Sequence, residues 1–284
     1  MALQPELVFL VLLAALAHAA WNAVVKASGA RNNTFAVILL TGGAVGLAGV
    51  ILLPLPAPQA WAFLAVSAVV HYGYYGFLLL AYRHGDLSHV YPLARGSAPL
   101  AVAAGAWLLA GEMLTPVGVA GLGLASAGLM SLAFENGVPR GHAGKPVVYA
   151  LGTGLLIAAY TVVDGLGVRA SLAPLSYIVW LNLLEAVPVV VWLAVWRPEG
   201  FVRQAGPWWR HGLIGGLLAT AAYGFVIYAM SAGGMAHVSA LRETSTLFAA
   251  LIGTLMLGER AGGPARRVIA AAMVSGGIVV LQLS

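Results

Sequence analysis

Ten long apolar segments alternate with short polar breaks along the chain. Each is about 20 residues long, which is the length that a helix needs to cross the hydrocarbon core of a bilayer. The longest hydrophilic break runs from Glu135 to Pro146 and separates two groups of five segments. The segments cover residues 7–26, 34–53, 60–82, 87–109, 115–134, 147–168, 175–196, 211–231, 235–257 and 264–283. This pattern predicts an all-α integral membrane protein with ten transmembrane helices.

The composition agrees with a protein whose solvent is lipid. The chain is 61% hydrophobic and 8% charged, whereas about 25% of the residues of an ordinary soluble domain are charged. There are no cysteines, which excludes disulfides and thiolate metal sites. The net charge of +5 comes from basic residues scattered among short loops, so it indicates membrane topology and not a nucleic-acid partner. No cofactor is predicted, because the Gly-rich sequences follow no strand.

Two intramembrane arginines mark an internal repeat. Arg95 and Arg242 lie in matching apolar segments, and each is followed seventeen residues later by the Glu of a Gly-Glu pair, at 111–112 and 258–259. We therefore expect one five-helix unit written twice, at 1–134 and 147–284, with a cytoplasmic linker at 135–146. Duplicated units around intramembrane charges are typical of secondary transporters.

Loop charge predicts the orientation of both units. Eleven of the fourteen Lys and Arg fall in the loops that follow an odd-numbered segment, namely Lys26, Arg31, Arg83, Arg140, Lys145, Arg197, Arg203, Arg210, Arg260, Arg266 and Arg267. The opposite side has only Arg169. By the positive-inside rule the basic loops are cytoplasmic and both termini are periplasmic. Corresponding loops of the two units differ in charge, so the repeat is predicted to be inverted.

The chain resembles the EamA family of the drug/metabolite transporter superfamily. The resemblance rests on Trp21-Asn22, on Lys26, on the sequence 85–95 that ends in Tyr-Pro-Leu-Ala-Arg, and on the two Gly-Glu pairs. It implies a ten-helix carrier of the bacterial inner membrane, often an exporter of amino acids or other small metabolites. The implied central cavity is lined by the first, third, fourth, sixth, eighth and ninth spans. The second half departs from the pattern at 240–243.

The charged residues inside the spans are candidates for solute recognition. A charge at this depth costs at least about 2.5–3.5 kcal/mol unless it faces protein or water. Arg95 and Arg242 either bind an anionic group such as a carboxylate or close a gate with a carboxylate. The alternative is a structural ion pair or a snorkelling side chain, and Glu243 is a partner that could neutralise Arg242. Pro92 and Pro99 flank Arg95 and predict a hinge, because proline removes a backbone donor and bends a helix. The alternative is a passive kink.

Aromatic and polar side chains recur at helical spacing on the first, third and sixth segments. Such faces form apolar walls with polar handles, which suit a small organic solute, although packing or an interfacial belt gives the same pattern. The predicted solute-binding residues are Trp21, Asn22, His71, Tyr74, Tyr75, Tyr91, Arg95, Ser97, Tyr160, Asp164, Tyr223, Arg242, Thr244 and Ser245. The alternative for Thr244 and Ser245 is that their hydroxyls bond their own helix carbonyls.

Glu185 lies near the centre of the seventh segment and is a candidate for proton coupling. Burial disfavours the charged form of a carboxyl, so this Glu could carry a proton. His18 and His71 are rival proton sites. A neutral, hydrogen-bonded structural Glu is the alternative, because the seventh span lies outside the cavity that the resemblance implies.

The sequence is compatible with three classes of function. The first is a secondary transporter that moves an amino-acid-like solute by alternating access, with the solute and the lipid bilayer as partners and no enzymatic activity. The second is an intramembrane enzyme that acts on lipid-linked substrates. The third is a channel or scaffold. A metal site at His84, Asp86 and His89 is not expected, because the three residues share a short loop without other ligands. The oligomeric state is not predicted.

Overall fold

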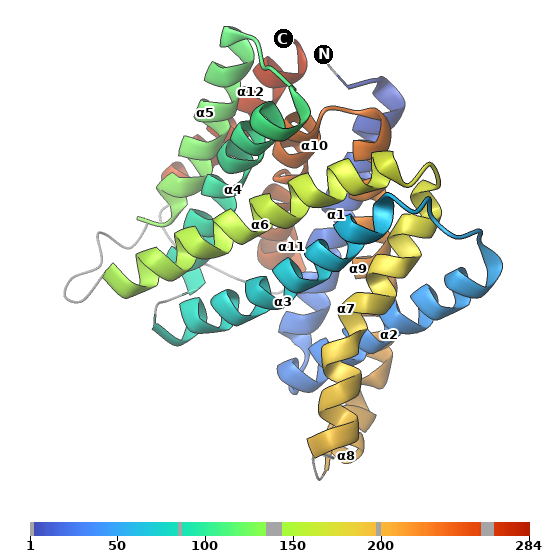
Figure 1. Ribbon diagram of the computed structural model, residues 1–284. Coiled ribbons are helices and arrows are strands. Elements are labelled where there is room, and N and C mark those ends of the chain that lie inside the picture. Colours follow the sequence, from blue (N-terminus) through green and yellow to red (C-terminus); the bar gives the residue numbers. More distant parts are fainter. Residues whose placement is uncertain (1–2, 85–86, 135–143, 197–199, 257–263) are drawn as a thin grey trace.

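The first half of the protein folds into five helices that follow the apolar segments. The computed structural model describes residues 3–84, 87–134, 144–196, 200–256 and 264–284 (Figure 1). The helices are α1 (Pro5–Ala27), α2 (Arg31–Leu52), α3 (Ala60–His84), α4 (Leu87–Ala110) and α5 (Pro116–Leu132). Each lies within a few residues of its predicted segment. α4 continues through both of its prolines, Pro92 and Pro99.

The second half is also helical but departs from the prediction in two places. A short helix α8 (Phe201–Ala205) and a 3₁₀ helix η1 (Gly206–Trp208) precede α9, and the predicted single helix over 235–257 is two helices. That prediction of one unbroken helix is wrong. The helices are α6 (Gly144–Ala170), α7 (Pro174–Trp196), α9 (Trp209–Ala232), α10 (Met235–Arg242), α11 (Ser245–Met256) and α12 (Pro264–Gln282).

The break between α10 and α11 is a local tightening of the chain at Glu243 and Thr244. The backbone N–H groups of these two residues donate to carbonyls only three residues earlier, at 3.0 Å to Ala240 and 3.1 Å to Leu241. This is the 3₁₀ pattern, which often marks a functional interruption of an α-helix. The Thr244 hydroxyl donates to the same Leu241 carbonyl at 2.8 Å. The tight turn brings Glu243 into the protein interior, where it is 1% exposed.

The helices pack in pairs through small residues. α5 lies along α12, α3 along α6, α1 along α9 and α2 along α7. A Cβ atom on Gly121 of α5 would lie only 2.7 Å from the carbonyl oxygen of Gly277 on α12. On α2, a Cβ atom on Gly46 would lie 2.6 Å from the carbonyl oxygen of Val179. Close backbone approach through small residues is how helices associate in lipid, where no hydrophobic effect drives them together.

The outer surface is suited to a bilayer. Seven of the described helices are long and apolar enough to cross a membrane, namely α1, α2, α3, α4, α6, α7 and α9, and α5 is a shorter apolar helix of 17 residues. Large apolar side chains such as Val69, Leu108 and Leu109 are more than half exposed on this surface. All regular structure in the described residues is helical. A helix bonds its own backbone polar groups, which is what a membrane span requires.

Candidate functional site

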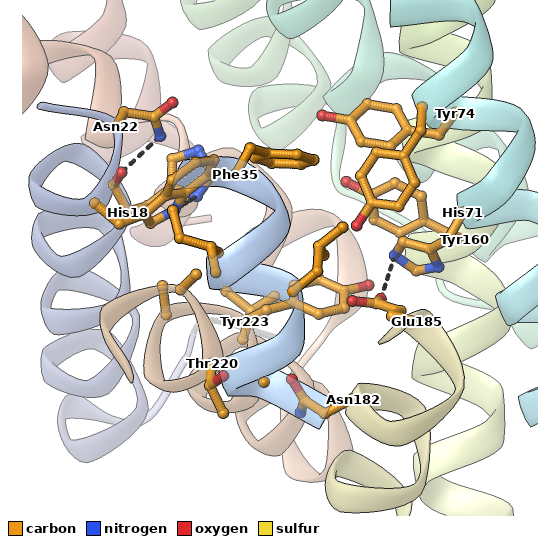
Figure 2. A pocket seen from close by; sticks show the side chains of 18 of the residues that line it. His18, Asn22, Phe35, His71, Tyr74, Tyr160, Asn182, Glu185, Thr220 and Tyr223 are labelled. Carbon is orange, nitrogen blue, oxygen red and sulfur yellow. Dashed lines mark hydrogen bonds and ion pairs between the residues drawn. The ribbon is translucent and has the colours of Figure 1, made fainter. Parts of the chain in front are cut away.

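A cavity of about 180 Å³ lies between the two halves of the chain (Figure 2). It is lined by helices of both halves, α1, α2, α3 and α4 from the first and α6, α7, α9 and α10 from the second. The lining residues are Ala14, His18, Trp21, Asn22, Phe35, Ile38, Leu39, Gly42, His71, Tyr74, Tyr75, Leu78, Tyr91, Arg95, Tyr160, Asn182, Glu185, Ala219, Thr220, Ala222, Tyr223, Val226 and Arg242. The cavity is smaller than the roughly 300–1,000 Å³ of pockets for drug-sized ligands, so its size favours a small solute.

Aromatic rings form one wall of the cavity. The rings of His71 and Tyr160 stack with their centroids 4.0 Å apart. Tyr74 and Tyr223 meet Tyr160 edge to face at 5.6 and 5.7 Å, and Phe35 meets Tyr75 in the same way at 5.8 Å. Edge-to-face and stacked pairs at these distances hold the rings in fixed orientations. The wall is therefore a rigid apolar surface with phenol groups at its edge.

The polar face that was predicted on α1 also lies at the cavity. The Trp21 indole N–H donates to Nδ1 of His18 at 3.3 Å, and the Asn22 amide donates to the His18 carbonyl oxygen at 2.7 Å. Because an indole nitrogen can only donate, the His18 ring accepts at Nδ1 and carries its proton on Nε2. His18 is therefore a neutral imidazole in this arrangement.

Arg95 and Arg242 converge on one carboxylate, that of Glu243. The Arg95 Nε atom lies 2.9 Å from Glu243 Oε2, whereas the Arg242 Nε atom lies 3.8 Å from Oε1. Arg95 also donates from Nη2 to the Ser245 hydroxyl at 3.3 Å. The sequence suggested Glu243 as the neutralising partner of Arg242, but its shorter contact is with Arg95. Two guanidinium groups and one carboxylate leave a net charge of +1 in this cluster.

Arg242 is the less satisfied of the two arginines. Its side chain is 4% exposed, and its Nε and Nη2 atoms are buried without a hydrogen-bond partner among the described residues. A buried donor without an acceptor is costly, and the cost is higher for a charged group. Arg242 also lines the cavity.

A carboxyl group and an imidazole face each other at a different part of the cavity. His71 Nε2 and Glu185 Oε1 lie 3.1 Å apart, with side-chain exposures of 5% and 14% (Figure 2). The neighbouring Tyr72 hydroxyl donates to the Leu184 carbonyl oxygen at 2.7 Å and ties α3 to α7. Glu185 therefore lies at the cavity, which corrects the expectation that the seventh span is excluded from it. α2 contributes as well, through Phe35, Ile38, Leu39 and Gly42.

Four predicted binding residues do not line the cavity. Asp164 is fully buried and accepts hydrogen bonds from Tyr177 at 2.9 Å and from Tyr223 at 2.5 Å, so it ties α6 to α7 and α9. The Ser97 and Thr244 hydroxyls donate to backbone carbonyls three residues earlier, at Ala94 and Leu241. The Ser245 hydroxyl accepts a hydrogen bond from Arg95, which itself lines the cavity. The structure thus gives these four residues supporting contacts.

The two histidines of the metal site that the sequence argued against each contact a different backbone carbonyl. His84 Nδ1 contacts the Leu80 carbonyl oxygen, and His89 Nδ1 contacts the Ala133 carbonyl oxygen, each at 2.8 Å. Asp86 lies outside the described residues, as do the pair at 258–259 and residues 135–143 of the predicted linker. No group of three metal-ligating side chains occurs in the described part of the chain.

A further ion pair joins several helices near their ends. Arg169 Nη2 lies 2.6 Å from Glu112 Oε1, with side-chain exposures of 32% and 22%. Arg169 also donates to the carbonyl oxygens of Met230 and Gly233, and Glu112 Oε2 accepts from the backbone N–H of Met235 at 2.7 Å. We call this set the clasp. It joins the ends of α4, α6 and α9 to the start of α10, whereas the cavity lies toward the end of α1 and the start of α4.

The second half of the chain is similar to a known protein family. The model of the EamA-like transporter family matches residues 144–283. None of the curated proteins matches the chain. A solved structure, described only as the crystal structure of a protein, is 20% identical and covers 99% of this chain and 97% of its own, with a TM-score of 0.76. At this identity the likeness shows the fold alone. The family match confirms the resemblance seen in the sequence.

Proposed function

The chain belongs, through residues 144–283, to the EamA-like transporter family of the drug/metabolite transporter superfamily, and on this premise we propose that it exports amino acids. It does so as a secondary transporter of the bacterial inner membrane, by alternating access. The family describes membrane transporters of small solutes. The amino-acid solute, the outward direction and the mechanism are our proposal.

The helix contacts support an inverted repeat of ten spans. We count α10 and α11 as one span and α8 with η1 as a connection. In this count α1 to α5 correspond to α6, α7, α9, α10–α11 and α12. Exchanging the halves turns the contact of α3 with α6 into that of α9 with α1, and both occur. The pairs α2–α7 and α5–α12 map onto themselves. Such self-consistent packing is expected of two units related by a two-fold axis, and an odd number of spans in each unit gives the second unit the opposite orientation.

The unsatisfied guanidinium of Arg242 is the observation that carries the solute assignment. Guanidinium groups bind carboxylates through two parallel hydrogen bonds, and Arg242 offers two buried donors without partners beside the cavity. The net +1 charge of its cluster attracts one anionic group. The aromatic wall accommodates an apolar side chain, and the carboxyl group of Glu185 provides an acceptor for an ammonium group. An amino acid combines these three features in one small molecule.

The clasp supports a cavity that faces the cytoplasm. The positive-inside rule places the ends of α4, α6 and α9 outside, and the clasp joins these ends. The cavity lies toward the other end, where the solute would enter from the cytoplasm. This is the loading state of an exporter, and release outside requires the clasp to open. Both termini are then periplasmic.

Counterflow in proteoliposomes tests the proposed function. Vesicles preloaded with an unlabelled mixture of the protein amino acids should take up the radiolabelled mixture faster than empty vesicles, because a carrier exchanges solute across the membrane. Arg242→Gln should slow this exchange by about 10–100-fold, since a hydrogen bond to a charged group contributes about 1.5–3 kcal/mol.

Arg210→Gln is the matched control for Arg242→Gln. Arg210 is exposed, lies over the Trp209 ring and is absent from the cavity wall, so its loss should leave exchange unchanged. Uptake that does not depend on preloading would favour a channel and contradict the proposal. Arg242→Gln exchange at the wild-type rate would remove Arg242 from the binding site.

A further inference from the structure

The pair of His71 and Glu185 includes the carboxyl group that we propose as the acceptor for the ammonium group of the solute. The two side chains come from α3 and α7, one from each half of the chain, and meet at the cavity wall (Figure 2). Glu185 Oε1 is buried and has no hydrogen-bond partner among the described residues apart from this contact with His71. A carboxyl group in such a place needs either a proton or a cation.

The other ring nitrogen of His71 decides how many protons the pair holds. His71 Nδ1 lies 2.9 Å from the Ser67 carbonyl oxygen and 3.2 Å from the Ser67 hydroxyl oxygen, which can either donate or accept. A carbonyl oxygen only accepts, so Nδ1 carries a proton and Nε2 of the neutral ring is a lone pair. That lone pair would face the carboxyl oxygen of Glu185 at 3.1 Å. One more proton between Nε2 and Oε1 turns this repulsion into a hydrogen bond. The geometry therefore fits a pair that shares one proton.

The groups around the pair do not supply another exchangeable proton at neutral pH. Phenols lose their proton only near pH 10 in water, guanidinium groups remain charged, and Asp164 is held by two tyrosine hydroxyls. His18 is a neutral acceptor of the Trp21 N–H. The titratable and charged groups of the cavity and its wall are His18 from α1, Tyr72, Tyr74 and Tyr75 from α3, Tyr91 and Arg95 from α4, Tyr160 and Asp164 from α6, Tyr223 from α9 and Arg242 from α10.

We propose that His71 and Glu185 together bind one exchangeable proton, and that the ammonium group of the solute displaces it. The shared proton leaves to water in the cavity, and the freed carboxylate of Glu185 accepts an N–H of the ammonium group. The N–H or O–H bond of the shared proton breaks, an O–H bond forms with the water that carries it away, and no bond between heavy atoms changes. Solute and proton then occupy the carrier in alternation, so that export of one solute is coupled to entry of one proton. This inference rests on the proposed transport function.

The contact between α3 and α7 explains how occupancy reaches the rest of the protein. His71 and Tyr72 are adjacent, and both reach across to α7, at Glu185 and at the Leu184 carbonyl oxygen. A proton or an ammonium group at Glu185 changes the contact between His71 and Glu185, whereas the contact of Tyr72 with a backbone carbonyl does not depend on either. Because α3 and α7 belong to different halves, the change acts between the two units whose relative movement alternating access requires.

A pH gradient across proteoliposomes tests the coupling. With an acidic lumen, and with the voltage held at zero by potassium and valinomycin, protons leave as the radiolabelled mixture of protein amino acids enters. We expect accumulation of up to about tenfold above the external concentration for each pH unit, because one proton exchanges for one solute. Counterflow without accumulation would overturn the proton inference but leave the proposed transport function intact. Absence of counterflow would overturn the transport proposal itself.

Two variants separate proton exchange from a structural contact. In Glu185→Gln the amide can donate to His71 Nε2, which imitates the proton-loaded pair, so gradient-driven accumulation should be lost. Tyr72→Phe removes the neighbouring contact between the same helices but no exchangeable proton, and it should still accumulate solute. Accumulation by Glu185→Gln at the wild-type level would overturn the inference.

Proton release by the detergent-purified wild-type protein provides a second measurement. Adding the amino-acid mixture to a weakly buffered sample should release about one proton for each solute bound, reported by a pH indicator. This measurement does not depend on the folding of Glu185→Gln. Solute binding, detected as a rise in thermal stability, without proton release would overturn the inference.

Discussion

The two segments that carry the intramembrane arginines, α4 and α10–α11, differ in helix continuity. The difference is the reverse of what their proline content predicts. α4 contains Pro92 and Pro99 and is continuous. Its counterpart in the second half has no proline between 235 and 256 and is nevertheless broken at Glu243 and Thr244. The break places the Glu243 carboxylate between the two arginines. In these two segments the interruption coincides with a buried carboxylate and not with a proline.

The arginines of these segments differ as well. Arg95 has an ion pair and a hydroxyl acceptor, whereas among the described residues Arg242 has a longer contact with the same carboxylate. Under the proposed function we therefore expect Arg95 to contribute mainly to folding and Arg242 mainly to solute binding. Both line the cavity, so lining alone does not distinguish these roles.

Replacement of Arg95 should have the largest effect on stability. Arg95→Gln leaves Glu243 buried without its closest cation, and breaking a buried ion pair from one side costs about 3–5 kcal/mol. Arg242→Gln should cost far less, because the shorter ion pair remains. The free energies of unfolding can be compared in mixed detergent micelles by tryptophan fluorescence. Equal losses in the two variants would contradict the division of roles.

Replacement of Ser245 should have an intermediate effect. Its hydroxyl accepts from Arg95 Nη2 at 3.3 Å across 150 positions of the chain, and a typical hydrogen bond contributes about 0.5–1.5 kcal/mol. Ser245→Ala should lose about 1 kcal/mol in the same unfolding measurement. Thr246→Ala is the control, because the Thr246 hydroxyl bonds only the nearby Glu243 carbonyl. A loss in the control as large as in Ser245→Ala would show that the contact with Arg95 is not responsible.

The clasp should contribute least to stability, although it joins the same two segments at their other ends. Glu112 follows α4 and accepts from Met235, the first residue of α10, and its ion pair with Arg169 is partly exposed. Such pairs contribute about 0–1 kcal/mol. Glu112→Gln keeps an acceptor for Met235 and should lose under about 1 kcal/mol while counterflow becomes faster, because opening outside is easier. Slower counterflow in a folded variant would contradict the gating role.

Most of the fold could be predicted from the sequence because hydrophobic length is a strong signal in membranes. α1 to α7, α9 and α12 follow the apolar segments closely. The break at Glu243 could not be predicted in this way, because no proline marks it and the residue that Glu243 pairs with, Arg95, lies far away in the sequence. The connection at α8 and η1 carries no apolar period of its own and was missed for that reason.

The candidate site was predicted in part, and the errors have a common cause. His71, Tyr74, Tyr75 and Tyr160 share helical faces that were visible in the sequence, and all line the cavity. Asp164 looked equally suitable, but the hydroxyls of Tyr177 and Tyr223 occupy its carboxylate. Helical periodicity shows which residues share a face. It does not show which of their hydrogen-bonding groups already have partners on neighbouring helices. The same limit hid the contribution of α2, whose lining residues are apolar and have no distinctive chemistry.

The shared proton of His71 and Glu185 makes the cycle sensitive to voltage. The loaded and unloaded forms of the pair differ by one elementary charge, so the leg that brings the proton inward moves a charge that the outward leg does not. Across a membrane potential of 100 mV, one charge corresponds to about 2.3 kcal/mol. A cell that is negative inside would thus draw the proton-loaded carrier back toward the cytoplasm electrically, even when the two compartments have the same pH.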